Sequence, residues 1–248
     1  SRYDEASQAL FFDRLAERLR ALPGVRAAGA TVVDPFSGWN LMNDVTPEDR
    51  AATAPSSGYM QAGWRSVTPA FFAAMGIPLV RGRVFASTDG PDGLPVAVVS
   101  RRLARALWPN EDAVGKRLYW GGTNGTPRTI VGVVGDIRDV APERDAEPML
   151  YVPHAQAATP AMTVVVRTAG EPAAMAGAVR DVIRGLDPLL PVSSIHPLTQ
   201  NRADALAAPR FRVLLMSVFA ALALLLAAAG ISAVIAFNVA RRRREIGI

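Results

Sequence analysis

Cysteine is absent from the 248-residue chain, and histidine occurs only twice, at His154 and His196. The lack of cysteine excludes a disulfide framework and metal sites held by thiolates. The two histidines lie far apart and each stands beside a proline, so the sequence indicates neither a histidine metal pair nor a catalytic triad. We expect both to have surface or packing roles.

Motifs for nucleotide binding are also missing. A phosphate-binding loop around Gly115 and Lys116 would need a glycine five residues before Gly115 and a serine or threonine after the lysine, but Asn110 and Arg117 stand there. The glycines at 121–125 and 132–135 lie before and inside a predicted strand, which does not fit a dinucleotide fingerprint. Any ATP hydrolysis is therefore expected in another chain or another region, and no cofactor is predicted.

Positive charge is concentrated at one end. The net charge is +5, and the four arginines of 241–244 together with Glu245 supply +3 of it, which leaves +2 for the other residues. A basic face spread over the molecule is therefore not expected, and no nucleic-acid partner is predicted. The first residues are polar and include neither a starting Met nor an apolar core, so no signal peptide is expected there.

One long apolar run dominates the C-terminal part. No charged residue occurs from 213 to 240, and 28 helical residues would reach about 42 Å, compared with roughly 30 Å of bilayer hydrocarbon. A soluble helix of this length without a polar face is unusual. We predict a transmembrane helix over 210–240, with a buried core helix as the alternative.

The flanking arginines predict the orientation of this helix. Basic residues are enriched on the cytoplasmic side of a membrane span, where they can contact anionic headgroups. The cluster after the run is therefore expected in the cytoplasm, and residues before about 210 outside it. The predicted membrane-interface residues are Arg210, Arg212, Arg241, Arg242 and Arg243.

Two helix patterns lie near the start and near the end of the first 205 residues. Apolar residues recur at helical spacing in 5–22, followed by the strand-like 25–33, and the pattern returns in 171–188 between the strand-like 162–168 and 191–196. We interpret 1–35 and 154–205 as one porter-like subdomain of two β-α-β repeats. The first repeat lacks its opening strand.

The middle of the chain is rich in short strands. Predicted strands lie within 36–153, and a short helix is expected at about 101–108; the strand segments are 64–67, 77–85, 95–100, 128–137 and 148–153. The polar segment 44–58 is expected to be a mobile loop. The predicted fold is therefore α+β, with 36–153 inserted as a β-rich subdomain and one transmembrane helix after the body.

Isolated polar and aromatic residues suggest structural roles. Ser100, between a strand and a helix, is predicted to be an N-cap, since no nucleophile elbow surrounds it. An acidic cluster lacks calcium-loop spacing and is expected to form a solvated turn with Arg138 and Arg144; its members are Asp136, Asp139, Glu143, Asp145 and Glu147. Four tryptophans without a regular interval are expected in the core or at a subdomain interface, namely Trp39, Trp64, Trp108 and Trp120.

Several phrases, in order, resemble one family. These are VTPAFFAAMGIPLVRGRVF, PVAVVSRRLARALWPNEDAVGKRLYW, RTIVGVVGDIRD and MTVVVRT, followed by an apolar run that closes in RREIGI. The chain resembles the MacB/FtsX-like permeases of ABC transporters, and more narrowly the multi-gene permease paralogues of GC-rich bacteria. The resemblance implies the periplasmic domain and second transmembrane helix of a permease subunit in the bacterial inner membrane.

What the resemblance implies about mechanism is mechanotransmission. Cytoplasmic ATPase subunits would dimerise on ATP, and the motion would pass through the bilayer to the periplasmic domains of two permease copies. A periplasmic adaptor is a further expected partner. The segment 241–248 would begin the cytoplasmic coupling region, and its predicted ATPase-coupling residues are Arg244, Glu245, Ile246, Gly247 and Ile248. The alternative hypothesis is a membrane-anchored periplasmic binding or adaptor module without energy coupling; neither hypothesis makes the chain an enzyme.

Overall fold

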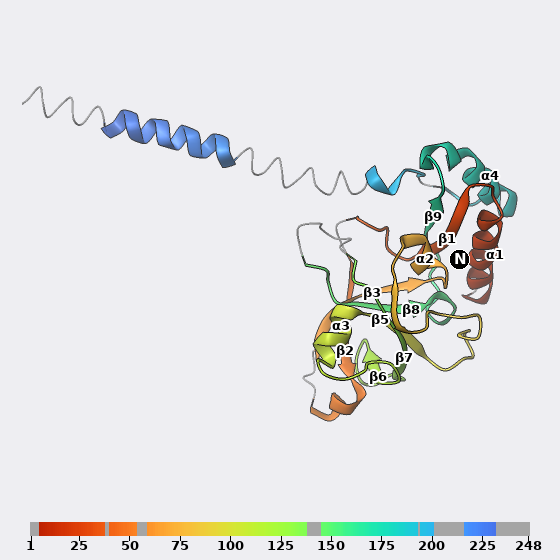
Figure 1. Ribbon diagram of the computed structural model, residues 1–248. Coiled ribbons are helices and arrows are strands. Elements are labelled where there is room, and N and C mark those ends of the chain that lie inside the picture. The colour runs from red at the N-terminus through yellow and green to blue at the C-terminus, as the bar shows by residue number, and fades with distance from the viewer. Residues whose placement is uncertain are drawn as a thin grey trace, which may run out of the picture. The chain divides into compact units, whose positions relative to one another are not determined.

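The computed structural model describes residues 5–37, 40–53, 59–137, 145–192, 194–200 and 216–231. The chain divides into two compact units, Ser1–Arg202 and Ala203–Ile248. Figure 1 shows the first unit as a body of mixed helices and strands. The α+β fold predicted from the sequence is confirmed.

The named elements of the first unit are four α-helices, nine strands and three short 3-10 helices, and residues 198–200 are also helical. The α-helices are α1 (Glu5–Arg20), α2 (Phe71–Met75), α3 (Arg101–Leu107) and α4 (Ala176–Leu186). The strands are β1 (Val25–Thr31), β2 (Leu41–Pro47), β3 (Met60–Val67), β4 (Leu79–Gly82), β5 (Val96–Ser100), β6 (Arg117–Trp120), β7 (Arg128–Val134), β8 (Met149–Pro153) and β9 (Thr163–Thr168). The 3-10 turns are η1 (Glu48–Thr53), η2 (His154–Gln156) and η3 (Pro172–Met175).

Six of the strands pair in a closed ring. The order β2-β6-β7-β5-β8-β3 returns to its start because β3 also pairs with β2. β1 joins β3 at a single pair, Thr31 with Val67, and β9 continues the sheet beyond β1 in a six-pair antiparallel ladder. β4 pairs with the second half of β7. Ring closure leaves few free strand edges, which protects the sheet from pairing with other chains.

Alternation along β5 divides the core between the two faces of the ring. Ala97 and Val99 point into one cluster, with Leu103, Leu107 and Trp108 of α3, while Val98 belongs to the cluster on the other face. This is the two-residue period of a strand buried on both sides. The Ser100 hydroxyl accepts a hydrogen bond from the Leu103 amide at 3.2 Å, so the predicted N-cap is confirmed. It also accepts one from the Met149 amide at 3.0 Å, which joins α3 to β8.

Aromatic residues fill the second cluster. Phe72 of α2 packs edge to face on Tyr151 of β8, with ring centroids 5.1 Å apart, and its ring is tilted against that of Phe85 at 5.9 Å. α2 lies directly on β1, because a Cβ added to Gly29 would be only 2.5 Å from the Phe71 backbone. A glycine is therefore required at this close approach.

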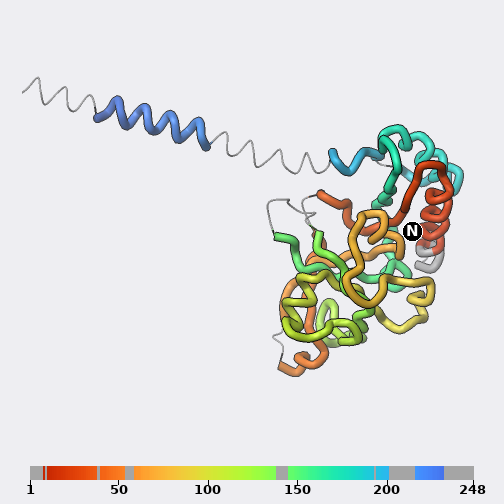
Figure 2. Tube along the Cα trace, in the orientation of Figure 1, coloured from red at the N-terminus to blue at the C-terminus, as the bar shows by residue number. Residues whose placement is uncertain are grey.

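The third cluster lies between the β1–β9 ribbon and two helices. α1 supplies Leu15 and Leu19, α4 supplies Val179 and Ile183, and β1 supplies Ala28 and Ala30. Figure 2 shows α1 and α4 side by side, in agreement with their contacts. The two predicted helical patterns thus bury their apolar stripes against the same ribbon.

Two local predictions are wrong. Residues 44–47 belong to β2 and 48–53 form η1, so the first part of the segment predicted as a mobile loop is regular structure; residues 54–58 lie outside the described part. The segment 191–196 is not a strand in any of its described residues, so the second predicted β-α-β repeat consists of β9 followed by α4. Its apolar residues pack on the third cluster instead. β6 was not predicted.

The division into 1–35 with 154–205 and 36–153 stays a prediction. The sheet crosses this boundary where β1 meets β3. In the second unit, 216–231 is helical and exposed. No helix among the described residues combines the length and apolar character that crossing a membrane requires. The predicted span 210–240 extends beyond the described helix at both ends and also stays a prediction.

Candidate functional surface

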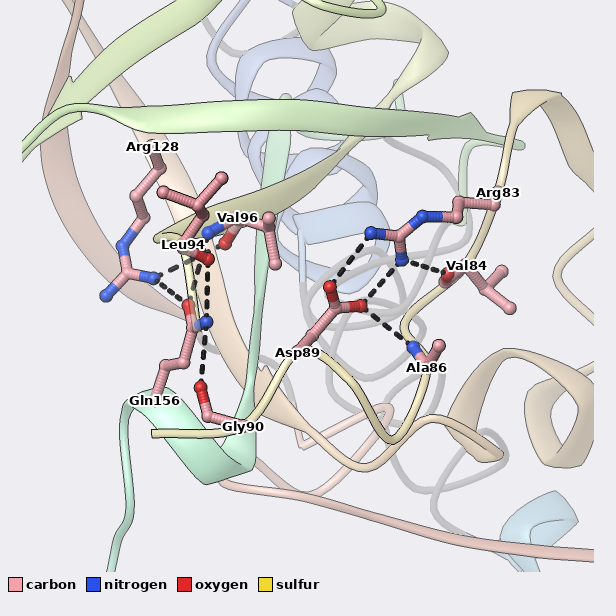
Figure 3. A network of polar contacts seen from close by, with 9 residues as sticks. All are labelled: Arg83, Val84, Ala86, Asp89, Gly90, Leu94, Val96, Arg128 and Gln156. Atoms are coloured by element: carbon pink, nitrogen blue, oxygen red, sulfur yellow. Dashed lines mark hydrogen bonds and ion pairs between the residues drawn. The ribbon is translucent and has the colours of Figure 1, made fainter. Parts of the chain in front are cut away.

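A loop after β4 is fixed by an ion pair at its base (Figure 3). Arg83 contacts Asp89 with two nitrogens, at 2.6 Å and 2.8 Å, and Asp89 also accepts a hydrogen bond from the Ala86 amide at 2.8 Å. The Asp89 side chain is only 6% exposed, and its hydrogen bond with Arg83 lowers its pKa below the ordinary value. Paired in this way, the carboxylate closes a tight turn from Arg83 to Asp89.

Gln156 of η2 holds the other end of the same loop. Its amide nitrogen donates to the carbonyls of Gly90 and Leu94 at 3.2 Å and 2.9 Å. Its carbonyl oxygen accepts from the Val96 amide at 3.1 Å and from Arg128 at 2.9 Å. The amide group thus donates twice and accepts twice, and Figure 3 shows these contacts around it. We call the loop 83–95 with Asp89 and Gln156 the clamped loop.

The clamped loop presents an apolar side chain to solvent. Leu94 is 81% exposed, although the backbone on either side of it is held by Gln156. The Arg128 guanidinium that supports Gln156 is itself partly buried over the Trp120 ring, 5.3 Å from its centroid, and burial lowers the pKa of Arg128. A loop with a fixed backbone loses little conformational entropy on contact with a partner.

A groove runs between β4 and α3. It has a volume of about 530 Å³, with Val80 and Val133 from the sheet and Ala104 and Trp108 from the α3 side among its lining residues. Its charged lining residues are Arg81, Arg101, Arg105, Glu111 and Asp112. A second hollow of about 450 Å³ shares Arg105 and includes Arg102, Asp136 and Asp145. We call the first of these the α3 groove.

Most charges around the α3 groove are paired. Arg81 contacts Asp112 at 2.8 Å, and Lys116 contacts Glu111 at 2.6 Å and lowers its pKa. In the second hollow, Arg102 contacts Asp145 at 3.3 Å and its amide donates to Asp136 at 2.7 Å. No ion pair is recorded between Arg101 or Arg105 and any residue that the structure describes.

The predicted coupling and interface residues all lie outside the described residues. This holds for Arg210 and Arg212 and for the whole segment 232–248, which contains Arg241, Arg242, Arg243, Arg244, Glu245, Ile246, Gly247 and Ile248. Their roles stay predictions.

The acidic cluster is only partly described. Asp145 pairs with Arg102, and Glu147 accepts a hydrogen bond from Asn40 at 2.9 Å, whereas Asp139, Glu143 and both predicted arginine partners lie outside the described part. Asp136 and Asp145 therefore both contact Arg102 in the second hollow, whereas Glu147 contacts Asn40.

The histidines and three tryptophans have the predicted packing or surface roles. His154 is buried and packs edge to face on Phe12, with centroids 5.3 Å apart, while His196 is exposed. Trp108 is buried in the first cluster. Trp64 and Trp120 pack against this cluster, and their own ring centroids are 4.7 Å apart. Trp39 lies outside the described residues.

Comparison with known proteins assigns the family. A family model described as the MacB-like periplasmic core domain matches residues 2–184, about three-quarters of the chain. The chain belongs to this family. Its members carry a periplasmic domain of MacB type, so an extracytoplasmic location follows for the first unit, and the resemblance found in the sequence is confirmed.

Solved structures of MacB-like domains show limited similarity to the chain. The periplasmic region of MacB from Actinobacillus actinomycetemcomitans has 15% identity and a TM-score of 0.48, over 70% of this chain and 73% of that chain. The extracellular domain of the ABC-type transporter YknZ from Gram-positive bacteria has 16% identity and a TM-score of 0.44, over 72% of this chain and 81% of that one. No curated protein matches the chain.

Proposed function

We propose that this MacB-like chain is the periplasmic domain and adjoining membrane helix of an ABC transporter permease subunit, and that it transmits ATP-driven motion to the periplasm. The observation that carries this proposal is the family match over 2–184, followed by the uncharged run 213–240 and its arginines. In this role the subunit is not catalytic, and a separate cytoplasmic ATPase supplies the energy. The location would be the bacterial inner membrane.

The construction of the first unit suits the transmission of motion. Clusters on both faces of one continuous sheet share its strands, so β1 contacts α2 on one face and α1 with α4 on the other. Close-packed interiors have low compressibility and pass displacement on with little loss. Motion delivered at one end of the unit would therefore move it as a body against a second permease copy or a periplasmic adaptor.

The coupling residues can be tested in the assembled transporter. The permease and its ATPase subunit are reconstituted in liposomes, and ATP turnover is compared between the native sequence and a variant in which the order of residues 244–248 is scrambled. We expect turnover to fall to that of the ATPase subunit alone, because the scrambled segment no longer fits its partner. Arg241, Arg242 and Arg243 are kept, so that membrane insertion is unchanged.

Two results separate the alternatives. Unchanged ATP turnover in the scrambled variant would show that 244–248 has no coupling role. If even the native permease leaves ATP turnover at the level of the isolated ATPase subunit, the chain acts as an anchored adaptor without energy coupling.

A further inference from the structure

The α3 groove combines apolar side chains with two arginines that form no ion pair with any residue that the structure describes. Val80 is 41% exposed on β4, a strand whose residues are all exposed, and Pro109, which follows α3, is exposed in the same groove. Trp108, Ala104 and Val133 form its buried floor. An exposed apolar surface of this kind, bounded by charged residues, is typical of sites that bind another molecule. The Arg81–Asp112 ion pair joins its two sides at one position.

Arg101 and Arg105 stand four residues apart on α3 and are both exposed. Residues at this spacing lie one above the other on the same helix face, so the two guanidinium groups repel each other. Arg101 also lies in the first turn, where the helix dipole disfavours a cation. Neither arginine has a recorded ion-pair partner among the described residues. This arrangement costs folding stability and suits an external anion.

The spacing of the two arginines fits an extended peptide. Cβ atoms at helical positions i and i+4 are about 5–6 Å apart. Side chains at alternate positions of an extended strand point the same way and are about 6.6 Å apart. Two carboxylates separated by one residue can therefore each contact one arginine. The remaining side chains of such a peptide can contact Val80 and Pro109.

A peptide suits this groove better than an anionic membrane surface. Glu111 and Asp112 are exposed in the same groove, so a flat layer of phosphate groups would also face two carboxylates. A peptide can put carboxylates against the arginines only. Its apolar side chains can also enter the groove, which a planar headgroup layer does not do.

We propose that the α3 groove binds an extended acidic segment of a partner protein, with carboxylates at alternate positions against Arg101 and Arg105. This docking site is separate from the ATPase-coupling role proposed above, since the groove lies entirely in the first unit. Long-range attraction between the arginines and an acidic partner also speeds association, and salt weakens it.

The probe is a phage-displayed library of random 12-residue peptides. It is selected against the full 248-residue chain in an uncharged detergent, and the enriched peptides are synthesised for affinity measurements. We expect enrichment of two acidic residues separated by one residue, beside apolar positions. The double variant Arg101→Glu with Arg105→Glu should bind the selected peptide more than about tenfold more weakly, because two attractive charge pairs become repulsive.

A matched control is available on α4. Arg180 and Arg184 have the same spacing, are both exposed and line neither hollow. The variant Arg180→Glu with Arg184→Glu changes the net charge equally and should keep the affinity of the native chain. A selected peptide with its two acidic residues replaced by lysine should bind the Arg101→Glu, Arg105→Glu variant better than the native chain. This charge reversal shows that the variant retains a folded groove.

Three results would overturn the proposal. The library could yield no peptide with the alternating acidic pattern. The α4 control could weaken binding as much as the groove variant, which would leave only attraction by net charge. Finally, soluble short-chain phosphatidylglycerol could bind through Arg101 and Arg105 when the selected peptide does not, which would make the groove a lipid headgroup site.

Discussion

At Gly29 the backbone of α2 occupies the space that a side chain would need. A methyl group there would be 2.5 Å from both the nitrogen and the Cα of Phe71. Both neighbours are backbone atoms in a packed core and cannot turn aside. We therefore expect Gly29→Ala to destabilise the first unit by about 2–3 kcal/mol, the upper part of the usual range for overpacking. Urea unfolding followed by circular dichroism measures the change.

The control substitution for this prediction should raise the free energy of unfolding. Gly185 lies in α4 with no atom within 4 Å of its added Cβ, so Gly185→Ala meets no obstacle and replaces a poor helix former. It should stabilise the unit by about 0.5–1 kcal/mol. Equal loss of stability in both variants would mean that the approach of α2 to β1 is not as close as described.

His154 makes the stability of the first unit depend on pH. It is 3% exposed, its Nδ1 lies 3.3 Å from the Ser66 hydroxyl, and burial lowers its pKa from 6.5 to about 4. Below pH 6.5 the His154 imidazole is protonated in the unfolded chain, whereas in the folded chain it stays neutral until about pH 4. Acidification therefore favours unfolding, and we expect a loss of up to about 3 kcal/mol between pH 7 and pH 4.

The variant His154→Leu isolates this effect. Its free energy of unfolding should change less between pH 7 and pH 4 than that of the native chain, and His196→Leu, at the exposed histidine, should behave as the native chain does. Ser66 keeps a partner in the variant, since its hydroxyl also donates to the Ala157 carbonyl at 2.8 Å. Arg83 lowers the pKa of Asp89, so the stability that this carboxylate contributes is present above its ordinary pKa of 3.8 and is lost only as the pH falls below that value, outside this window. Identical pH slopes for native and His154→Leu chains would contradict the assignment.

At the scale of elements, Gln156 joins η2 to the clamped loop and to the start of β5. The variant Gln156→Ala would remove one hydrogen bond each from the Gly90 and Leu94 carbonyls, the Val96 amide and Arg128. The Gly90 carbonyl still accepts from the Gly93 amide and Arg128 still donates to the Val96 carbonyl, so the main loss falls on the Leu94 carbonyl and the Val96 amide. Leaving such groups unpaired costs about 1–3 kcal/mol. We expect faster hydrogen exchange at the Val96 amide, with β7 and β8 unchanged, because the loss is local.

A matched substitution is Gln61→Ala on β3, where the glutamine is exposed. It should change stability by less than about 0.5 kcal/mol and leave the exchange of Val96 as it is. If exchange rises across the whole sheet in Gln156→Ala, the glutamine supports the fold generally and does not act as a local clamp.

Helices and strands whose apolar residues recur with a clear period could be predicted from the sequence. Elements that form only because distant strands pair with them could not. α1 and α4 repeat apolar residues at helical spacing, and β5 and β8 are short apolar runs buried on both faces. β2 has the polar sequence LMNDVTP and becomes a strand because it closes the ring between β3 and β6. Pairing with distant strands, which no local pattern reports, overrides its weak propensity.

The segment 191–196 shows the opposite error. Its apolar residues resemble a strand, but the ribbon of β1 and β9 already has α1 and α4 on that face, and Val192 and Ile195 pack on the third cluster as irregular chain. The α3 groove could not be predicted from the sequence either. The spacing of Arg101 and Arg105 is visible in RRLARAL, yet only the fold shows that β4 lies beside α3 and that Arg81 is already paired.

For the whole molecule, one sheet connects regions that are far apart in sequence. β1 near the start pairs with β9, which ends at Thr168, and the ring between them is composed of residues from 41 to 153. The β1–β9 ribbon is joined to the ring by the single pair Thr31–Val67, and α2 packs on both through the aromatic cluster, so packing holds the ribbon against the ring. This is the physical basis for treating the first unit as one body in the proposed transmission of motion.

The orientation of the chain gives the last prediction. If 210–240 crosses the bilayer with its arginines in the cytoplasm, alkaline phosphatase inserted after Gly125 will be active, because that enzyme folds only outside the cytoplasm. Gly125 is exposed and has open space around it, so the insertion leaves the ring intact. Green fluorescent protein after Ile248 should fluoresce in the same cells, expressed from the native gene. Replacing arginines 241 to 244 with asparagine removes the charge bias that sets orientation and should reduce both signals. Inactive phosphatase with a fluorescent insertion at Gly125 would place the first unit in the cytoplasm and exclude the proposed transmission to the periplasm.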